Sequence, residues 1–241
     1  TLMGQQVYVR CQAILREMDA LRDLVASDAP PTGTLRLGVP QTLGDVVLLD
    51  ALKHLRRRFP ELRTQVATGW GSQLLGKLEL DAVAALFPAG KLFPEHVLGE
   101  SLGELELVVV SARERGFKRL VGLADVQADG WILNPDGCGF RAGLQRALAG
   151  LGLNLKTNLE TFGTELQLGL VAEGLGLGLV PRELLERSTH RERLVALTLK
   201  DFKPILHLWL VFPRFLGNLQ APVEYFGELV AESLKAPGQA A

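Results

Sequence analysis

Cys138 lies between two glycines, in the segment Gly137-Cys138-Gly139, and this setting is typical of a nucleophile held in a tight turn. A catalytic cysteine needs a base, usually a histidine that the fold brings within hydrogen-bond reach. No motif links Cys138 to any histidine of the sequence, which are His54, His96, His190 and His207. We therefore expect Cys138 to be a structural thiol or to line a ligand site.

Two further motifs come close to known chemistry without completing it. Residues 71–77 match the spacing G-x-x-x-x-G-K of a phosphate-binding loop, but Leu78 follows where such a loop needs Ser or Thr to hold Mg²⁺. The glycines of segment 174–178 lack the spacing of a dinucleotide fingerprint, and the sequence has no G-x-S-x-G elbow. Its histidines and cysteines show no metal-ligand spacing. The sequence therefore predicts no enzyme, no cofactor and no metal site.

The composition of the chain argues against several functional classes. Its 241 residues carry 26 Lys and Arg against 27 Asp and Glu, so the net charge is −1 and the basic excess of a domain that binds DNA by itself is missing. A 47% share of hydrophobic residues argues against disorder, and no apolar run approaches the ~20 residues of a membrane helix. Two cysteines and no secretory signal indicate a cytoplasmic protein.

The first segment, from Gln5 to Ala26, is a predicted helix because it contains no Pro or Gly. Its apolar residues repeat at alternating spacings of 4 and 3, which is the a/d pattern of a coiled coil. This apolar stripe consists of Val7, Cys11, Ile14, Met18, Leu21 and Val25. Such a stripe must be buried, either on the chain's own body or on a second copy. We favour a second copy, because the Pro-rich segment 27–33 separates the helix from the body.

Strands and helices alternate in the rest of the chain, in two similar runs. The first has strands at 35–39, 62–68 and 81–87, a helix that Thr42 or Asp45 caps and Pro60 ends, and a short helix at 73–78. The second has strands at 131–133, 153–160 and 177–180, with helices at 140–149 and 164–172. This order predicts two α/β subdomains with parallel sheets. Strands at 105–110 and 206–212 would cross between them, and a helix at 222–234 would return to the first.

Ligands of open α/β sheets bind beyond the carboxyl ends of strands, where helix N-termini offer free N–H groups to an anion. Three such places follow predicted strands: residues 40–43, 134–140 and 162–164. Two facing subdomains would bring them to one cleft, so we predict a small carboxylate or phosphate ligand. Structural roles stay open for each residue: Thr42 and Thr164 as helix caps, Trp70 as a turn residue, and Phe140 and Phe162 as core.

Six short motifs follow one another along essentially the whole chain. Thr1–Gly4 leads into the heptad helix, Gly33–Pro40 opens the body, and Val171–Pro181 is a late glycine-rich segment. Between them stand Phe59-Pro60-Glu61-Leu62, Gly69-Trp70-Gly71-Ser72 and Leu80-Asp81-Ala82-Val83. In this order and spacing the chain resembles a LysR-type transcriptional regulator without its winged helix-turn-helix, which would end at Thr1–Gly4.

The resemblance implies two Rossmann-like subdomains of the type II periplasmic-binding-protein fold, joined by two crossover strands and preceded by a long linker helix. The linker and dimerisation helix would span 1–28, subdomain I 33–108 and 208–235, and subdomain II 109–207. A co-inducer in the interdomain cleft would contact Gln41, Thr42, Gly69, Trp70, Phe87, Pro88, Asn134, Phe140, Phe162, Gly163 and Thr164. Many family members carry Ser or Thr where this chain has Gly163, so that hydroxyl is missing here.

The resemblance also implies a homodimer or homotetramer whose effector domains pair side by side and antiparallel. Helix 43–55 of one copy would then lie against helix 164–172 of the other, and the run Val46-Val47-Leu48-Leu49 independently fits such a contact because it is apolar all round. The predicted dimer contacts are Val46, Val47 and Leu49, with Val7, Ile14 and Leu21 of the first helix. DNA would be contacted only through the missing N-terminal domain. The rival is a solute-binding protein or an enzyme on the same fold, which the coiled-coil helix disfavours.

Overall fold

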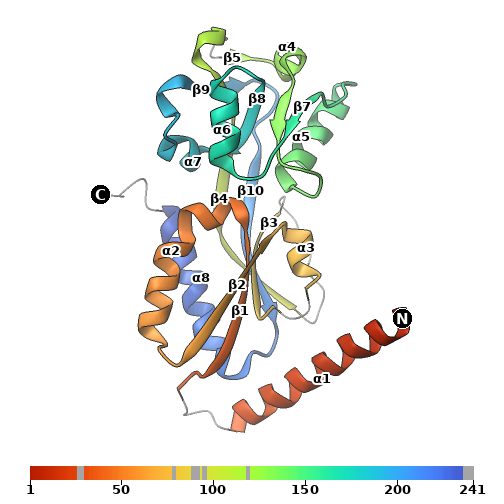
Figure 1. The fold of residues 1–241 in the computed structure, drawn as a ribbon, viewed down its shortest axis with the longest axis vertical. Helices are drawn as coiled ribbons and strands as arrows, with labels where there is room; N and C mark the ends of the chain where they lie inside the picture. The colour runs from red at the N-terminus through yellow and green to blue at the C-terminus, as the bar shows by residue number, and fades with distance from the viewer. Residues whose placement is uncertain (26–29, 78–79, 88–92, 94–96, 118–119, 236–241) are drawn as a thin grey trace. The chain divides into compact units, whose positions relative to one another are not determined.

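The computed structural model describes residues 1–25, 30–77, 80–87, 93, 97–117 and 120–235, and its chain divides into two compact units. Unit 1 comprises residues 1–103 and 208–235, and unit 2 comprises residues 104–207. Strand β4 (Val97–Ala112) and strand β10 (Ile205–Pro213) each contribute residues to both units (Figure 1). The chain therefore passes between the units within two strands, as expected for crossover strands.

Unit 1 is a sheet with helices on both faces (Figure 1). Its strands run in the order β2-β1-β3-β10, with β1 parallel to both β2 and β3. Helices α2 and α8 pack together on one face, and α3 lies on the other (Figure 1). The remaining bounds are α1 Leu2–Val25, β1 Gly33–Pro40, α2 Gln41–Arg58, β2 Leu62–Gly69, α3 Gly71–Leu75, β3 Ala82–Phe87, η4 Gly217–Leu219 and α8 Gln220–Lys235.

The register of unit 1 is held by apolar burial and by one buried carboxylate. Asp81, at the start of β3, accepts a hydrogen bond from the backbone N–H of Arg36 at 2.6 Å and donates its own N–H to the Arg36 carbonyl at 2.8 Å. Leu35 and Leu37 of β1 are fully buried beneath the helices. Removing apolar surface of this size from water stabilises the unit by about 2 kcal/mol per leucine. The parallel register of β1 and β2, which pairs Pro40 with Gly69, sets the carboxyl ends of these two strands side by side.

Unit 2 has its own mixed sheet, in the order β4-β8-β6-β7. Strand β6 is parallel to β7 and β8, whereas β4 is antiparallel to β8 and to β9, which pairs with β5. The bounds are β5 Leu120–Val121, β6 Trp131–Leu133, β7 Thr157–Glu160, β8 Leu177–Pro181 and β9 Leu194–Leu199. Helices are η1 Arg113–Arg115, α4 Leu123–Val126, η2 Gln127–Asp129, α5 Gly139–Gly150, α6 Thr164–Ala172, α7 Arg182–Arg187 and η3 Arg191–Arg193.

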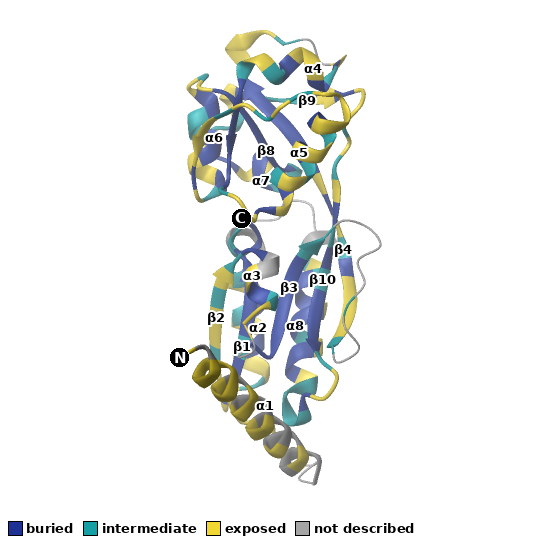
Figure 2. Ribbon diagram, turned by 90° about the vertical axis from the view of Figure 1, so that its right-hand side faces the viewer, coloured by how far each residue is buried: buried dark blue, intermediate teal, exposed yellow. Residues whose placement is uncertain are grey.

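Figure 2 shows that buried residues fill the central strands of each unit, such as β1 and β3 or β6 and β8, whereas α1 is largely exposed along its described side chains. Ile14 is 60% exposed, and Val7, Cys11, Met18 and Leu21 are exposed too, so the described body does not cover these five residues of the heptad stripe. Helix α1 is thus an amphipathic helix whose apolar stripe has no cover within the described part of one chain.

Several sequence predictions need correction in detail. The helix expected at 73–78 is Gly71–Leu75, the strand expected at 153–160 begins only at Thr157, and α7 and β9 were not anticipated. The predicted cap of α2 was also wrong: its N-cap residue is Pro40, and no side chain bonds that helix end. The physical reason is that β1 runs straight into α2, which leaves no loop residue to act as a cap. The polar tail 235–241 falls outside the described residues beyond Lys235.

Candidate functional site

The unit 1 half of the predicted site lies at the carboxyl ends of β1, β2 and β3. The parallel register pairs Pro40 with Gly69, the last residues of β1 and β2. Gln41 and Trp70, which follow these two strands, therefore lie at the same end of the sheet. Thr42 and Trp70 are buried, while Gln41 and Gly69 are half-buried. Phe87 ends β3, and its ring packs edge-on to that of Phe93 with centroids 5.8 Å apart. These predicted residues therefore do gather at one end of the unit 1 sheet.

The start of α2 offers backbone donors at this end. An α-helix leaves its first N–H groups without partners inside the helix, and here no side chain caps them. With 18 residues in α2, the helix dipole adds a partial positive charge at the same place. This half of the site can bind a negatively charged group through main-chain N–H groups, beside the hydroxyl of Thr42 and the indole of Trp70.

The unit 2 half lies at the carboxyl ends of β6 and β7. Leu133 pairs with Glu160 in the parallel ladder, which sets Asn134 beside Thr161 and brings segment 162–164 to the same end of the sheet. Phe140 and Thr164 are buried, whereas Phe162 is 59% exposed and is therefore no core residue. Gly163 has a left-handed φ of 87° and is the N-cap residue of α6, so the suggested cap role of Thr164 was wrong.

The loop between β6 and α5 holds the most constrained polar groups of this half. Asn134 is only 7% exposed; its side-chain amide donates to Cys138 Sγ at 3.8 Å, and its Oδ1 has no hydrogen-bond partner in the described structure. A buried acceptor without a partner costs free energy, about 1–3 kcal/mol, which a ligand donor could recover. Cys138 is the N-cap residue of α5, and burial raises the pKa of its thiol despite hydrogen bonds that lower it.

Arg141, in the first turn of α5, is a residue that the sequence analysis missed. Its guanidinium donates to the Asn134 carbonyl at 3.3 Å and pairs with Asp136 at 3.0 Å and with Glu160. A cation at a helix N-terminus opposes the helix dipole, so an arginine there needs such carboxylate partners. That unfavourable position was the feature in the sequence that could have identified it. The side chain is 13% exposed and fixes the loop at residues 134–138.

Some of the predicted effector contacts and dimer contacts are not among the described residues. Pro88 and the side chains of Val46 and Val47 lie outside the described part of the structure. Among the other predicted dimer residues, Leu49 on α2 is 74% exposed. On α6, the helix predicted to face it in a second copy, Leu166 is 58% exposed.

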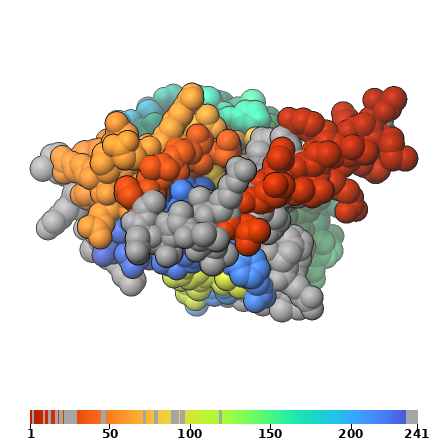
Figure 3. All heavy atoms as spheres, turned by 90° about the horizontal axis from the view of Figure 1, so that it is seen from below, coloured from red at the N-terminus to blue at the C-terminus, as the bar shows by residue number. Residues whose placement is uncertain are grey.

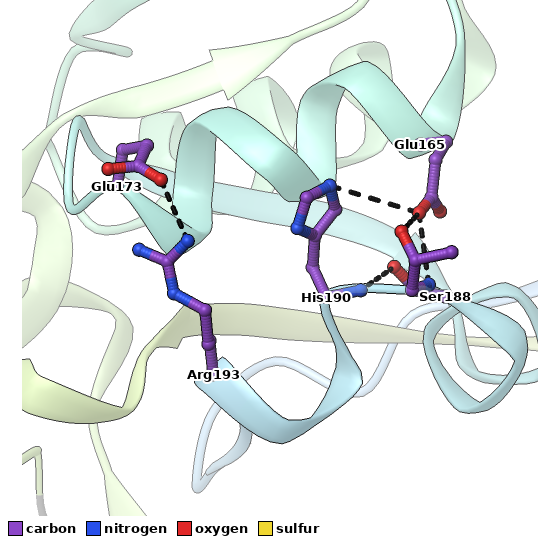
Figure 4. A network of polar contacts seen from close by, with 6 residues as sticks. Glu165, Glu173, Ser188, His190 and Arg193 are labelled. Carbon is purple, nitrogen blue, oxygen red and sulfur yellow. Dashed lines mark hydrogen bonds and ion pairs between the residues drawn. The ribbon is translucent and has the colours of Figure 1, made fainter.

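Beside α6 lies a polar network that includes a serine, a histidine and a glutamate (Figure 4). Glu165 accepts hydrogen bonds from the backbone and hydroxyl of Thr189, and its carboxylate is 3.9 Å from His190 Nε2. The hydroxyl of Ser188 accepts the backbone N–H of His190 at 3.1 Å and also hydrogen-bonds to the Glu165 carboxylate, so the carboxylate engages the serine proton. Arg193 pairs with Glu173 at 2.8 Å near the other end of α6. The network clamps segment 188–193 onto α6 and does not form a catalytic triad.

The near-motifs of the sequence also have structural roles where they are described. Residues 71–75 form α3, and Lys77 donates its N–H to the Leu74 carbonyl at 3.0 Å, so this segment is helix and turn rather than a phosphate loop. Within the described residues, no three His, Cys, Asp or Glu side chains are grouped so as to hold a metal ion. The described helices include none with the length and apolarity to cross a membrane.

Comparison with known proteins gives one consistent family. A family model described as the LysR substrate binding domain matches residues 28–235. The HTH-type transcriptional regulator GltR of Bacillus subtilis is 26% identical over 199 residues, which cover 82% of this chain and 66% of GltR. A probable hydrogen peroxide-inducible genes activator of Streptomyces viridosporus is 29% identical over 194 residues, covering 78% of this chain and 62% of the relative. The chain thus spans less than two thirds of each relative.

Solved structures show the same fold at low identity. A full-length OxyR variant from Pseudomonas aeruginosa superposes with a TM-score of 0.78 at 18% identity, covering all of this chain and 80% of the other. An OxyR2 regulatory domain from Vibrio vulnificus gives 0.70 at 18% identity, covering 85% and 97%. The α/β architecture predicted from the sequence, with its periplasmic-binding-protein-like fold, is therefore confirmed.

Proposed function

The chain belongs to the LysR substrate-binding domain family, and on that premise we propose that it senses a small anionic co-inducer and transmits binding to a DNA-binding domain. The match of the family model over 28–235 is the observation that carries the proposal. The relatives are named transcriptional regulators, so the coarse function is regulation of transcription rather than catalysis. In this proposal a helix-turn-helix domain recognises the DNA sequence, and the regulator acts in the cytoplasm.

The proposed ligand contacts are the predicted residues at the carboxyl ends of β1, β2 and β3 in unit 1 and of β6 and β7 in unit 2. The N-termini of α2 and α6 support an anionic ligand, because each presents main-chain N–H groups and the positive end of a helix dipole. Asn134 Oδ1 supports a ligand that also carries a hydrogen-bond donor. A hydroxy or amino acid would satisfy both requirements. Ligand binding then favours one arrangement of the regulator over another, because its affinity for the two arrangements differs.

Calorimetric titration with a panel of acetate, succinate, citrate, serine, benzoate and inorganic phosphate tests this proposal. We expect at least one to bind with a micromolar to millimolar Kd, and Thr42→Ala and Trp70→Ala each to weaken it roughly 10-fold through lost polar and aromatic contacts. Thr198→Ala, on an exposed position of β9, is the matched control. Unchanged affinity in both site variants would exclude the unit 1 half of the site.

The second part of the proposal is self-association through three apolar surfaces. Leu49 on α2, Leu166 on α6 and the stripe on α1 are exposed in one chain, and burying such side chains against a second copy is favourable by about 2 kcal/mol each. Sedimentation equilibrium should show a dimer or tetramer that Leu49→Glu and Leu166→Glu dissociate at least ~10-fold more readily. Leu151→Glu, another exposed leucine of unit 2, should leave the equilibrium unchanged. A monomeric parent chain would contradict the proposal.

A further inference from the structure

The C-terminal end of α2 and the start of β2 carry a concentration of cations that the effector site does not use. The cluster, here called the α2–β2 cation cluster, consists of Arg57, Arg58 and Arg63, all exposed. Arg57 and Arg58 lie in the last turn of α2, and Arg63 lies on β2. The orange surface in Figure 3, which includes this part of the chain, is open to solvent in the view from below.

The fold holds this cluster in place through a neighbouring arginine. Arg56 donates from its guanidinium to the carbonyls of Pro60 and Leu62, at 3.3 Å for Leu62, and so ties the end of α2 to the start of β2. The ring of Phe59 packs edge-on to that of Tyr225 on α8, with centroids 6.0 Å apart. Thr34 of β1 is the register partner of Arg63. Arg56 therefore has a structural role, and the other cations stand on a fixed backbone.

Carboxylates close to the cluster do not neutralise it in the described structure. Glu61 lies in the turn, and Glu224 and Glu228 lie on α8, but none forms an ion pair with Arg57, Arg58 or Arg63. Lys53, by contrast, pairs with Asp50 at 3.2 Å and is left out of the cluster. Favourable interaction with the helix C-terminus explains a cation in the last turn of α2. It does not explain Arg63, which lies on a strand.

We infer that the α2–β2 cation cluster binds the phosphate backbone of duplex DNA without reading its sequence. Guanidinium groups match phosphate geometry, and releasing counterions from DNA favours such contacts. The described residues 53–65 expose no large apolar side chain, but Val66, further along β2, is 37% exposed, so an acidic protein partner is tested by the competition experiment below. The relatives are named transcriptional regulators, and the choice of duplex DNA as the partner rests on the proposed function, which brings DNA to the chain. The inference does not depend on the identity of the effector.

Fluorescence anisotropy of the 241-residue chain with a labelled random-sequence duplex tests the inference. The variant carrying Arg57→Gln, Arg58→Gln and Arg63→Gln should bind at least ~10-fold more weakly at about 50 mM salt, and the slope of log K against log salt should fall by about 3. The matched control carries Arg146→Gln, Arg187→Gln and Lys200→Gln, the same charge change at exposed positions of unit 2. It should change the slope by less than ~0.5.

Three results would overturn the inference. The parent chain fails to bind the duplex, the two triple variants lose the same affinity, or polyglutamate competes as well as duplex DNA at equal charge concentration. The last result would assign the cluster to acidic protein segments. Thermal unfolding and the calorimetric titration of the panel acids check that the triple variant is folded and still binds effector, which separates failure here from failure of the proposed function.

Discussion

The carboxyl end of β1 in unit 1 and that of β6 in unit 2 carry the two halves of the proposed site, and they are built differently. Strand β1 runs directly into α2 through Pro40, so this half offers mainly backbone N–H groups, a hydroxyl and an aromatic ring. Strand β6 is followed by a loop at 134–138 before α5 begins, and the loop holds a buried amide, a buried thiol and the partners of Arg141.

This difference indicates a division of labour between the halves. Backbone N–H groups attract any small anion, because they read charge rather than shape. A buried amide with an unpaired acceptor discriminates, because a ligand that lacks a donor leaves it unsatisfied. We therefore expect helix N-termini in both halves to provide affinity for an anion, and the buried amide of the unit 2 half to provide specificity in addition. The predictions below test whether the unit 2 loop has this fixed, dry character.

The largest expected difference concerns the two thiols. Cys11 on α1 is exposed, whereas Cys138 in the unit 2 half is buried and its pKa is raised by that burial. Since thiolate is the reactive form, a disulfide reagent at neutral pH should modify Cys11 at least ~100-fold faster than Cys138 in the dissociated chain, where no second copy covers the α1 stripe. Single-cysteine variants, Cys11→Ser and Cys138→Ser, distinguish the sites, and both thiols should react quickly in denaturant. Equal rates in the folded chain would mean that the loop is open rather than dry.

The second prediction compares two buried amides of unit 2. Gln167 donates to the Ile132 carbonyl at 2.7 Å, whereas Asn134 Oδ1 has no partner in the described structure. Gln167→Met should lower the free energy of unfolding by about 1–2 kcal/mol, because it breaks a satisfied buried bond. Asn134→Leu should change it by less than ~1 kcal/mol, because a desolvated acceptor is removed, but it should weaken effector binding.

Urea unfolding, followed by calorimetric titration of each variant, measures both effects. If Asn134→Leu destabilises the chain as strongly as Gln167→Met and leaves the affinity for effector unchanged, Asn134 is a structural residue. The proposed division of labour would then lose its main support.

The third prediction contrasts two glycines of unit 2 with open space around them. A Cβ at Gly163 or at Gly143 would meet no atom within 4 Å, but Gly163 has a φ of 87° and Gly143 lies inside α5. Gly163→Ala should destabilise the chain by about 1 kcal/mol through backbone strain. Gly143→Ala should stabilise it by roughly 0.5–1 kcal/mol, because alanine favours helix. Equal shifts in Tm would show that the α6 N-terminus is not held in the left-handed conformation.

The fold was more predictable from the sequence than the site. The run Leu35–Val39 was recognised because apolar residues end at Pro40, and the structure extends it by only one or two residues at each end. The strand predicted at 105–110 was too short, because β4 begins at Val97. The strand expected from Leu153 begins at Thr157, because its partner β6 begins at Trp131 and a strand needs a neighbour to pair with. The order of the strands also predicts which site residues gather at the carboxyl ends of each sheet. By contrast, the unpaired state of Asn134 and the caps of α2 and α6 depend on three-dimensional contacts that spacing does not reveal.

The smallest expected effect lies at the N-terminal turn of α6, beside the unit 2 half. Partial burial raises the pKa of Glu165, but hydrogen bonds from Thr189 and Ser188 and the nearby His190 outweigh it, so the pKa is lowered overall. A carboxyl group with a lowered pKa stabilises the folded chain above its unfolded pKa of about 4.3, and this contribution is lost as the pH falls through the folded value. Because the side chain is half exposed, the contribution should stay below ~1 kcal/mol.

Comparing Glu165→Gln with the parent chain by urea unfolding between about pH 3 and pH 7 isolates that contribution, because the variant no longer titrates at this position. The difference in stability should be largest near neutral pH and should vanish in acid. Glu192→Gln, at an exposed carboxylate of η3 without an ion-pair partner in the described structure, is the matched control and should track the parent chain. A difference that grows toward acid would mean that Glu165 is held protonated. Segment 188–193 would then not fix the start of α6, and the unit 2 half would lack the rigid positioning on which its proposed specificity depends.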